Sequence, residues 1–134
     1  MADSIELEVA TPERAMVSEQ VTDVQVPGQD GYLGILPGHA PLLSLLGAGA
    51  LSYASGGARH FLAVQGGLVE VLSGHVRVLA NLAERAEDID VAKARTDLES
   101  AQKEMHAATT GDASTAALEA VALARARIAA VEGK

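Results

Sequence analysis

The amino-acid usage of this 134-residue chain changes near residue 85, and no other feature constrains its fold as strongly. Eleven of the 13 glycines and all four prolines lie in residues 1–85. Residues 86–134 contain 15 alanines and only two glycines. Glycine and proline interrupt short strands with turns, whereas alanine is the best helix former. We therefore expect two domains, a β-domain over residues 1–85 and an α-helical domain over residues 86–134.

Apolar and polar residues alternate through the first half, which is the pattern of half-buried strands. Ile5, Leu7 and Val9 are separated by Glu6 and Glu8. No helix alternates with these strands, so a parallel nucleotide-binding sheet is not expected. Many short strands with turns between them predict a β-sandwich or a flattened barrel. The same period of two recurs at Val24–Val26, Leu51–Tyr53, Leu62–Val64, Val69–Val71 and Val76–Val78.

The second half has the pattern of two helices separated by a break. Apolar residues recur at steps of three and four from Ala94 to Met105, and again from Ala117 to Val131. Gly111 lies between the two stripes and is suited to ending a helix. The pattern predicts an antiparallel two-helix hairpin, whose first helix Asp88 or Asp90 would cap.

The small side chains of both stripes bear on how the hairpin packs. Alanine removes little apolar area from water, so each helix gains little from its contacts. We expect the hairpin to pack weakly and to be able to move. A fixed helical appendage is the alternative.

Charge and composition exclude several classes of protein. A net charge of −8, with Phe61, Tyr32 and Tyr53 as the only aromatic residues, argues against binding to nucleic acid. It also disfavours direct attachment to an anionic membrane surface. No apolar run approaches the roughly 20 residues of a membrane span, and the acidic first residues do not resemble a signal peptide. We expect a cytoplasmic protein that reaches a membrane only through a partner, without inserting into it.

No group of residues in the sequence has the spacing of an active site. His39, His60 and His75 show no metal-ligand spacing, and the chain contains no cysteine. The serines form no nucleophile motif. The glycines of residues 28–34 are followed by neither a lysine nor a helix, so they do not form a phosphate loop. We predict no catalytic residue and no metal site.

Residues 28–43 read GQDGYLGILPGHAPLL, the most specific motif of the chain. Two further segments accompany it in order: GGLVEV at residues 66–71 with VRVLA at residues 76–80, and IDVAKA at residues 89–94. Together these segments closely resemble the epsilon subunits of bacterial F-type, proton-transporting ATP synthases. An isolated glycine motif arises easily by chance, whereas three ordered segments that span most of the chain do not.

The resemblance implies an α+β fold, with a β-sandwich of about ten strands followed by the helical hairpin. It implies a subunit without a catalytic site of its own, present in one copy per complex. Such a subunit lies on the central stalk beside the gamma subunit, rests on the c-subunit ring, and couples proton translocation to ATP synthesis. The complex would hold it at the cytoplasmic face of the bacterial plasma membrane.

Interface residues follow by position in the motif. The resemblance implies a c-ring interface at Gln29, Asp30, Gly31 and Tyr32. Tyr32 occupies a position that is acidic in some relatives, which changes the chemistry expected of that contact. The implied gamma-subunit interface consists of Pro37, Gly38, His39, Ala40, Pro41, Leu42 and Leu43.

Some members of this family bind ATP on the folded hairpin, and the resemblance implies a site of that kind here. Lys93 replaces the motif arginine and lacks the planar guanidinium that holds phosphate through two hydrogen bonds. Ala129 stands where a second arginine is expected. We therefore predict a weak regulatory ATP site and no other cofactor. Its candidate residues are Glu84, Ile89, Asp90, Lys93, Ala94 and Arg125.

Arg125 and Arg127 are the only arginines after Gly111. In an extended hairpin we expect them to contact the catalytic alpha and beta subunits and to restrain ATP hydrolysis. Two other classes remain open on the residues alone. One is a free-standing sandwich enzyme or small-ligand binder with a helical lid, and the other is an adaptor whose hairpin binds in a partner's groove.

Overall fold

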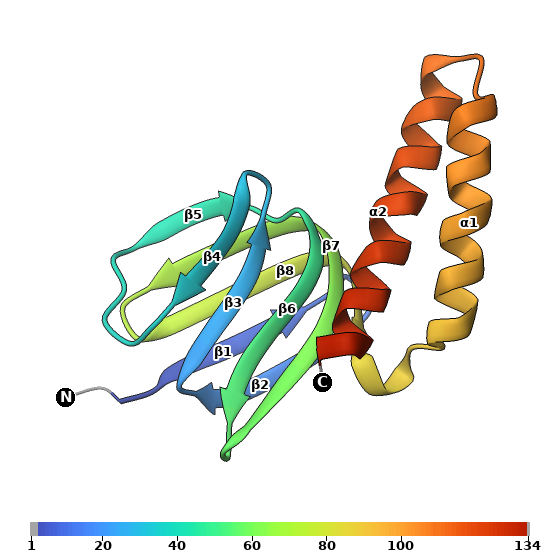
Figure 1. Cartoon of the computed structure of the whole chain (residues 1–134). Helices are drawn as coiled ribbons and strands as arrows, with labels where there is room; N and C mark the ends of the chain where they lie inside the picture. The colour runs from blue at the N-terminus through green and yellow to red at the C-terminus, as the bar shows by residue number, and fades with distance from the viewer. Residues whose placement is uncertain (1–2, 134) are drawn as a thin grey trace.

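The computed structural model describes residues 3–133 and contains a β-sandwich followed by two helices (Figure 1). This arrangement confirms the predicted fold class. The strands are β1 (Ile5–Ala10), β2 (Ala15–Val21), β3 (Asp23–Gly28), β4 (Gly31–Ile35), β5 (Leu42–Leu45), β6 (Ala48–Ser55), β7 (Ala58–Leu72) and β8 (His75–Arg85). A short 3₁₀ turn, η1 (Ala86–Asp88), leads to the helices α1 (Val91–Ala107) and α2 (Gly111–Gly133).

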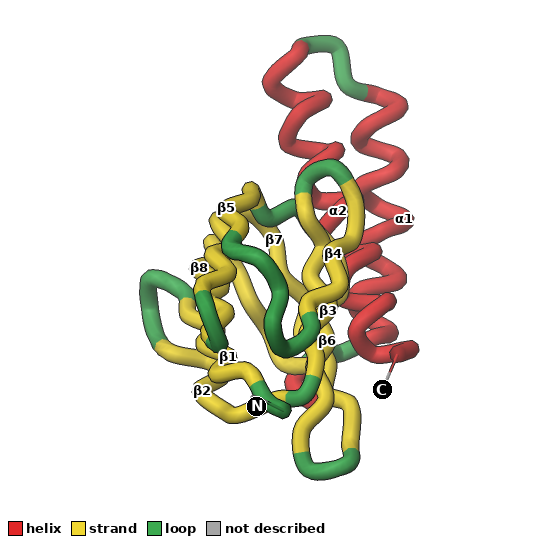
Figure 2. Tube along the Cα trace, turned by 90° about the vertical axis from the view of Figure 1, so that its left-hand side faces the viewer, coloured by secondary structure: helices red, strands yellow, loops and turns green. Residues whose placement is uncertain are grey.

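The strands follow the order β2-β1-β8-β7-β6-β3-β4, and β5 pairs separately with β7. β1 and β8 run parallel, and the other pairs are antiparallel. Figure 2 shows β1, β2, β5 and β8 on one side of the sandwich and β3, β4 and β6 on the other. The long strand β7 contributes to both layers, because its first part pairs with β6 and its last part with β5.

The two layers meet where β7 bends at Gly66 and Gly67, which have φ values of 72° and 125°. A side chain at Gly67 would place its Cβ 1.9 Å from the carbonyl oxygen of Leu79, so only glycine fits there. Residues 3–133 contain eight strands instead of about ten, because β7 and β8 each continue past this bend. Dividing both strands there would bring the count to ten.

The core of the sandwich consists of the inward residues of the alternating strands, as predicted. Leu7, Val24, Leu51, Val64 and Val78 are fully buried. At the open edge, side chains connect β2 to β6: the Tyr53 hydroxyl and the Ser55 hydroxyl each donate a 3.0 Å hydrogen bond to the Glu19 carboxylate. The apolar core thus closes between residues of the first 80 positions.

The two helices form the predicted antiparallel hairpin, which stands beside the sandwich with its tip far from the strands (Figure 1). Asp90 caps α1, where its Oδ1 accepts a 3.1 Å hydrogen bond from the backbone N–H of Lys93. The connection between the helices lies at residues 108–110, immediately before Gly111. The residues of the predicted stripes that become buried are Ala94, Ala101, Ala117, Val121 and Ala124.

Helix α2 has a second buried face that the sequence analysis did not predict. Ala126 and Ala130 are buried against Ala63 of β7 and Ala86 of η1. Phe61 lies at the edge of this cluster, where a side chain at Gly133 would come within 2.5 Å of the ring. Small residues on both sides allow α2 to lie close against β6 and β7.

Candidate functional site

The segment Gly28–Leu43 forms the turn between β3 and β4 and the connection from β4 to β5. Gln29, Asp30 and Gly31 are exposed at the tip of the turn, where Gly31 has a φ of 137°. The backbone N–H of Gln29 donates a 3.0 Å hydrogen bond to the carbonyl oxygen of Leu45. The turn is therefore held in place while its side chains remain free to contact another molecule.

Tyr32 differs from the other three residues of the predicted ring interface. Its side chain lies against β6, and its hydroxyl accepts a 3.0 Å hydrogen bond from the backbone N–H of Ala50. A Cβ at Gly49 would lie 2.6 Å from this hydroxyl, so the glycine makes room for the phenol. Tyr32 remains 60% exposed and lines a shallow hollow together with Arg125 of α2.

The connection from Leu36 to Pro41 covers one end of the sandwich. Gly38 has a φ of 87°, and the backbone N–H of His39 donates a 3.1 Å hydrogen bond to the carbonyl oxygen of Leu36. The His39 Nδ1 lies 2.7 Å from the carbonyl oxygen of Ala40, so it donates the hydrogen bond there. These contacts fix the turn that precedes β5.

Four leucines extend the surface of this segment across three strands, and we call them the leucine row. Leu43 and Leu45 lie on β5, Leu68 on β7 and Leu79 on β8. Leu45 pairs with Leu68, and Leu68 pairs with Leu79, so their side chains are neighbours on one face. Their exposed fractions of 67%, 52%, 40% and 48% make this a continuous apolar surface.

A row of charged residues lies beside Leu45, Leu68 and Leu79, two residues away along each strand, and Leu43 stands at its end. Leu43 pairs with Glu70, Glu70 pairs with Arg77, and Arg77 pairs with Glu8 of β1. Arg77 Nε donates a 3.2 Å hydrogen bond to Glu8, and His75 Nε2 lies 2.9 Å from the same carboxylate oxygen. The hydrogen bond from Arg77 is the main cause that lowers the pKa of the Glu8 carboxyl, and the hydrogen bond with His75 is the second.

Sequence reasoning did not find the leucine row, although a signal was present. A half-buried strand carries polar residues at its outward positions. Leu68 and Leu79 adjoin the buried Val69 and Val78, so they occupy outward positions. Recognising them required the alignment of β5, β7 and β8, which the sequence pattern does not give.

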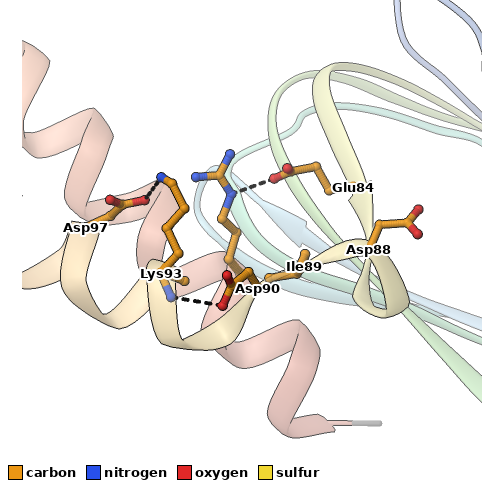
Figure 3. Close-up of a pocket in the computed structure, with 8 residues that line it drawn as sticks. Glu84, Asp88, Ile89, Asp90, Lys93 and Asp97 are labelled. Atoms are coloured by element: carbon orange, nitrogen blue, oxygen red, sulfur yellow. Dashed lines mark hydrogen bonds and ion pairs between the residues drawn. The ribbon is translucent and has the colours of Figure 1, made fainter.

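Five of the six predicted nucleotide-binding residues meet where α1 begins (Figure 3). A hollow of about 240 Å³ lies between the end of β8, η1 and the two helices. It is lined by Glu84, Asp88, Ile89, Asp90, Lys93, Ala94, Asp97 and Arg127. Arg125 points elsewhere and lines the hollow beside Tyr32, so the structure places Arg127 where Arg125 was expected.

Both cations of this hollow are already paired with carboxylates. Arg127 Nε donates a 2.6 Å hydrogen bond to Glu84, and Lys93 Nζ lies 2.8 Å from Asp97. Asp90 is the helix cap. The lining holds four carboxylates, one lysine and one arginine, an excess of two negative charges.

Residues 3–133 show neither a membrane helix nor a metal centre. Neither helix is long and apolar enough to cross a bilayer. No three histidine, aspartate or glutamate side chains of this range are grouped to hold a metal ion.

The chain is similar to known proteins in both its sequence and its fold. Residues 4–86 match the family model of the ATP synthase delta/epsilon chain, β-sandwich domain. The chain is 54% identical to the ATP synthase epsilon chain of Solibacter usitatus over the whole of both chains. It is 49% identical to that of Carboxydothermus hydrogenoformans over 78% of each chain.

The fold recurs in a solved structure of the Euglena gracilis mitochondrial ATP synthase that contains OSCP, F1 and the c-ring. The TM-score is 0.83 at 22% identity, with 92% of this chain and 79% of that chain covered. This likeness supports the fold, and the close sequence relatives confirm the resemblance stated above. The chain belongs to the family of ATP synthase epsilon chains, which are subunits of the complex without being its catalytic subunits.

Proposed function

We propose that this chain couples rotation in an F-type ATP synthase by joining the gamma subunit to the c-subunit ring. The leucine row carries this proposal. Four exposed leucines on one sheet face continue directly from the loop Pro37–Leu43, and an apolar surface of this kind is expected to be covered in an assembly. Because the charged row runs beside it, we expect gamma to present an apolar strip with polar groups along one side.

The ring contact in this proposal lies at the turn between β3 and β4. Gln29, Asp30 and Gly31 supply exposed polar groups and backbone that suit polar loops of the c subunits. Tyr32 is engaged with β6, so it contributes through the exposed side of its ring. The complex would hold the chain as a peripheral subunit at the cytoplasmic face of the membrane, in one copy.

The hairpin has a regulatory role in this proposal. Its cluster with the sandwich consists mostly of alanines, so undocking exposes little apolar area. Arg125 is exposed, and Arg127 becomes available when its contact with Glu84 breaks. Both can then contact acidic segments of the alpha and beta subunits and resist rotation in the direction of ATP hydrolysis.

Binding of variants to isolated gamma subunit tests the proposed interface. Leu43→Asp places a charge within the leucine row, and Gly38→Val forces a β-branched residue to adopt a φ of 87°. We expect either change to weaken binding about tenfold or more, measured by calorimetry. Leu118→Asp is a matched control, because Leu118 is 54% exposed on the hairpin, outside the leucine row. Unchanged binding of Leu43→Asp would place the gamma contact on another surface.

A further inference from the structure

Glu84 and Arg127 form the one ion pair in residues 3–133 that joins a helix of the hairpin to a strand. The other ion pairs of the helices, Lys93–Asp97, Arg95–Glu132 and Glu99–Lys103, lie within the hairpin. The side chains of Glu84 and Arg127 are 34% and 24% exposed, so water screens the pair only in part. A second polar contact also joins the hairpin to the sandwich. The uncharged Nε2 of Gln65 donates a 2.9 Å hydrogen bond to the carbonyl oxygen of Glu119.

The hollow around this pair does not fit ATP. A triphosphate carries several negative charges, and the lining already has an excess of two. Both cations of the lining are occupied, Arg127 by Glu84 and Lys93 by Asp97. A phosphate would have to compete with these carboxylates and would leave at least one of them beside it without a partner.

We propose that the Glu84–Arg127 ion pair is a latch that holds the hairpin against the sandwich without a bound nucleotide. The position of each partner supports this role. Glu84 lies one residue before the end of β8, where the chain leaves the sandwich, and Arg127 lies between the buried Ala126 and Ala130 of α2. The bond therefore lies beside the small apolar contact between hairpin and sandwich. This inference rests on the proposed mobility of the hairpin.

Native-state hydrogen exchange of the full chain tests the latch. We expect Glu84→Gln and Arg127→Gln each to raise the exchange rate of α2 amides roughly two- to fivefold, the range for a partly exposed ion pair. The exchange of β7 amides should stay unchanged. The charge-swapped variant Glu84→Arg with Arg127→Glu should restore slow exchange. Glu132→Gln is the matched control, because it breaks an ion pair that joins α1 to α2 and leaves the sandwich contact intact.

Salt and ATP provide two further measurements on the same samples. High salt should speed α2 exchange more in the parent chain than in Arg127→Gln, since only the parent chain has the Glu84–Arg127 pair to screen. ATP at millimolar concentration should leave α2 exchange unchanged. Protection of α2 by ATP, or parent-like exchange in both Gln variants, would overturn the latch.

The same measurement separates failure of the latch from failure of the proposed mobility. If α2 amides of the parent chain exchange as slowly as those of β7, the hairpin opens only when the whole domain unfolds. That result would remove the mobile hairpin from the proposed function. Faster exchange in α2 than in β7, combined with no effect of the Gln variants, would overturn the latch alone.

Discussion

Tyr53 is buried where β6 approaches β2, with its hydroxyl bonded to Glu19 and its ring stacked on His60. Burial, supported by the hydrogen bond to Glu19, raises the pKa of Tyr53 from 10.0 to about 12. The unfolded chain therefore releases this proton at lower pH than the folded chain. The contribution of the neutral phenol to stability is complete below about pH 10 and is lost as the pH rises towards 12.

We expect the free energy of unfolding to fall between pH 10 and 12, with Tyr53 responsible for a decrease on the order of 1 kcal/mol. Urea unfolding at a series of pH values measures it. Tyr53→Phe should be less stable at neutral pH, because it lacks the bond to Glu19, and should show a shallower alkaline decline. Equal slopes for parent and variant would mean that Tyr53 is accessible to water.

At the scale of single residues, position in the motif predicted most of the residues that line the hollow but not its arginine. The motif placed Asp90, Lys93 and Glu84 together, and the structure brings them to one hollow. It did not distinguish Arg125 from Arg127, which lie two residues apart. In a helix such a step turns the side chain by about 200°, so one arginine points into the hollow and the other away.

The composition change at residue 85 predicted the elements, and the structure shows why this prediction succeeded. In a strand, the alternation of apolar and polar residues identifies one buried face. In a helix, apolar residues at steps of three and four do the same. Helix α2 has two, because one face packs on α1 and another, with Ala126 and Ala130, packs on the sandwich. Alanine fits either a buried or an exposed position, so the second face could not be read from hydrophobicity.

The separation of the two apolar clusters leads to a prediction about the elements. The main core is built from residues 5–80, and the cluster beneath α2 is separate from it. We expect a chain ending at Arg85 to retain β-sheet circular dichroism and to unfold cooperatively, because its core is complete without the helices.

The truncated chain also leaves Phe61 uncovered, so Phe61→Gln in the same chain serves as a control for aggregation. Retained amide protection in β7 and β8 is the decisive measurement. Loss of protection in both versions would show that the sandwich depends on the hairpin for its stability.

At the scale of the whole molecule, the sandwich and the hairpin present different surfaces. The leucine row lies on β5, β7 and β8, whereas α2 packs on β6 and the part of β7 that pairs with it. Under the proposed function, a contact with gamma through the leucine row leaves the helices free to move. This separation depends on long-range strand pairing, for which the sequence holds no local signal.

The proposed latch and the proposed inhibitory contact share Arg127, and this shared use predicts opposite effects in the assembled complex. Glu84→Gln releases the hairpin and leaves Arg127 free to contact the catalytic subunits, so ATP hydrolysis should fall, by at most about fivefold. Arg127→Gln releases the hairpin as well but removes the contact, so hydrolysis should equal or exceed the parent rate.

Arg125→Gln should raise hydrolysis without changing α2 exchange in the isolated chain, because Arg125 does not line the hollow. Steady-state hydrolysis measured with each variant reconstituted into the same complex decides the matter. If Glu84→Gln and Arg127→Gln shift the rate in the same direction, Arg127 does not act in both contacts.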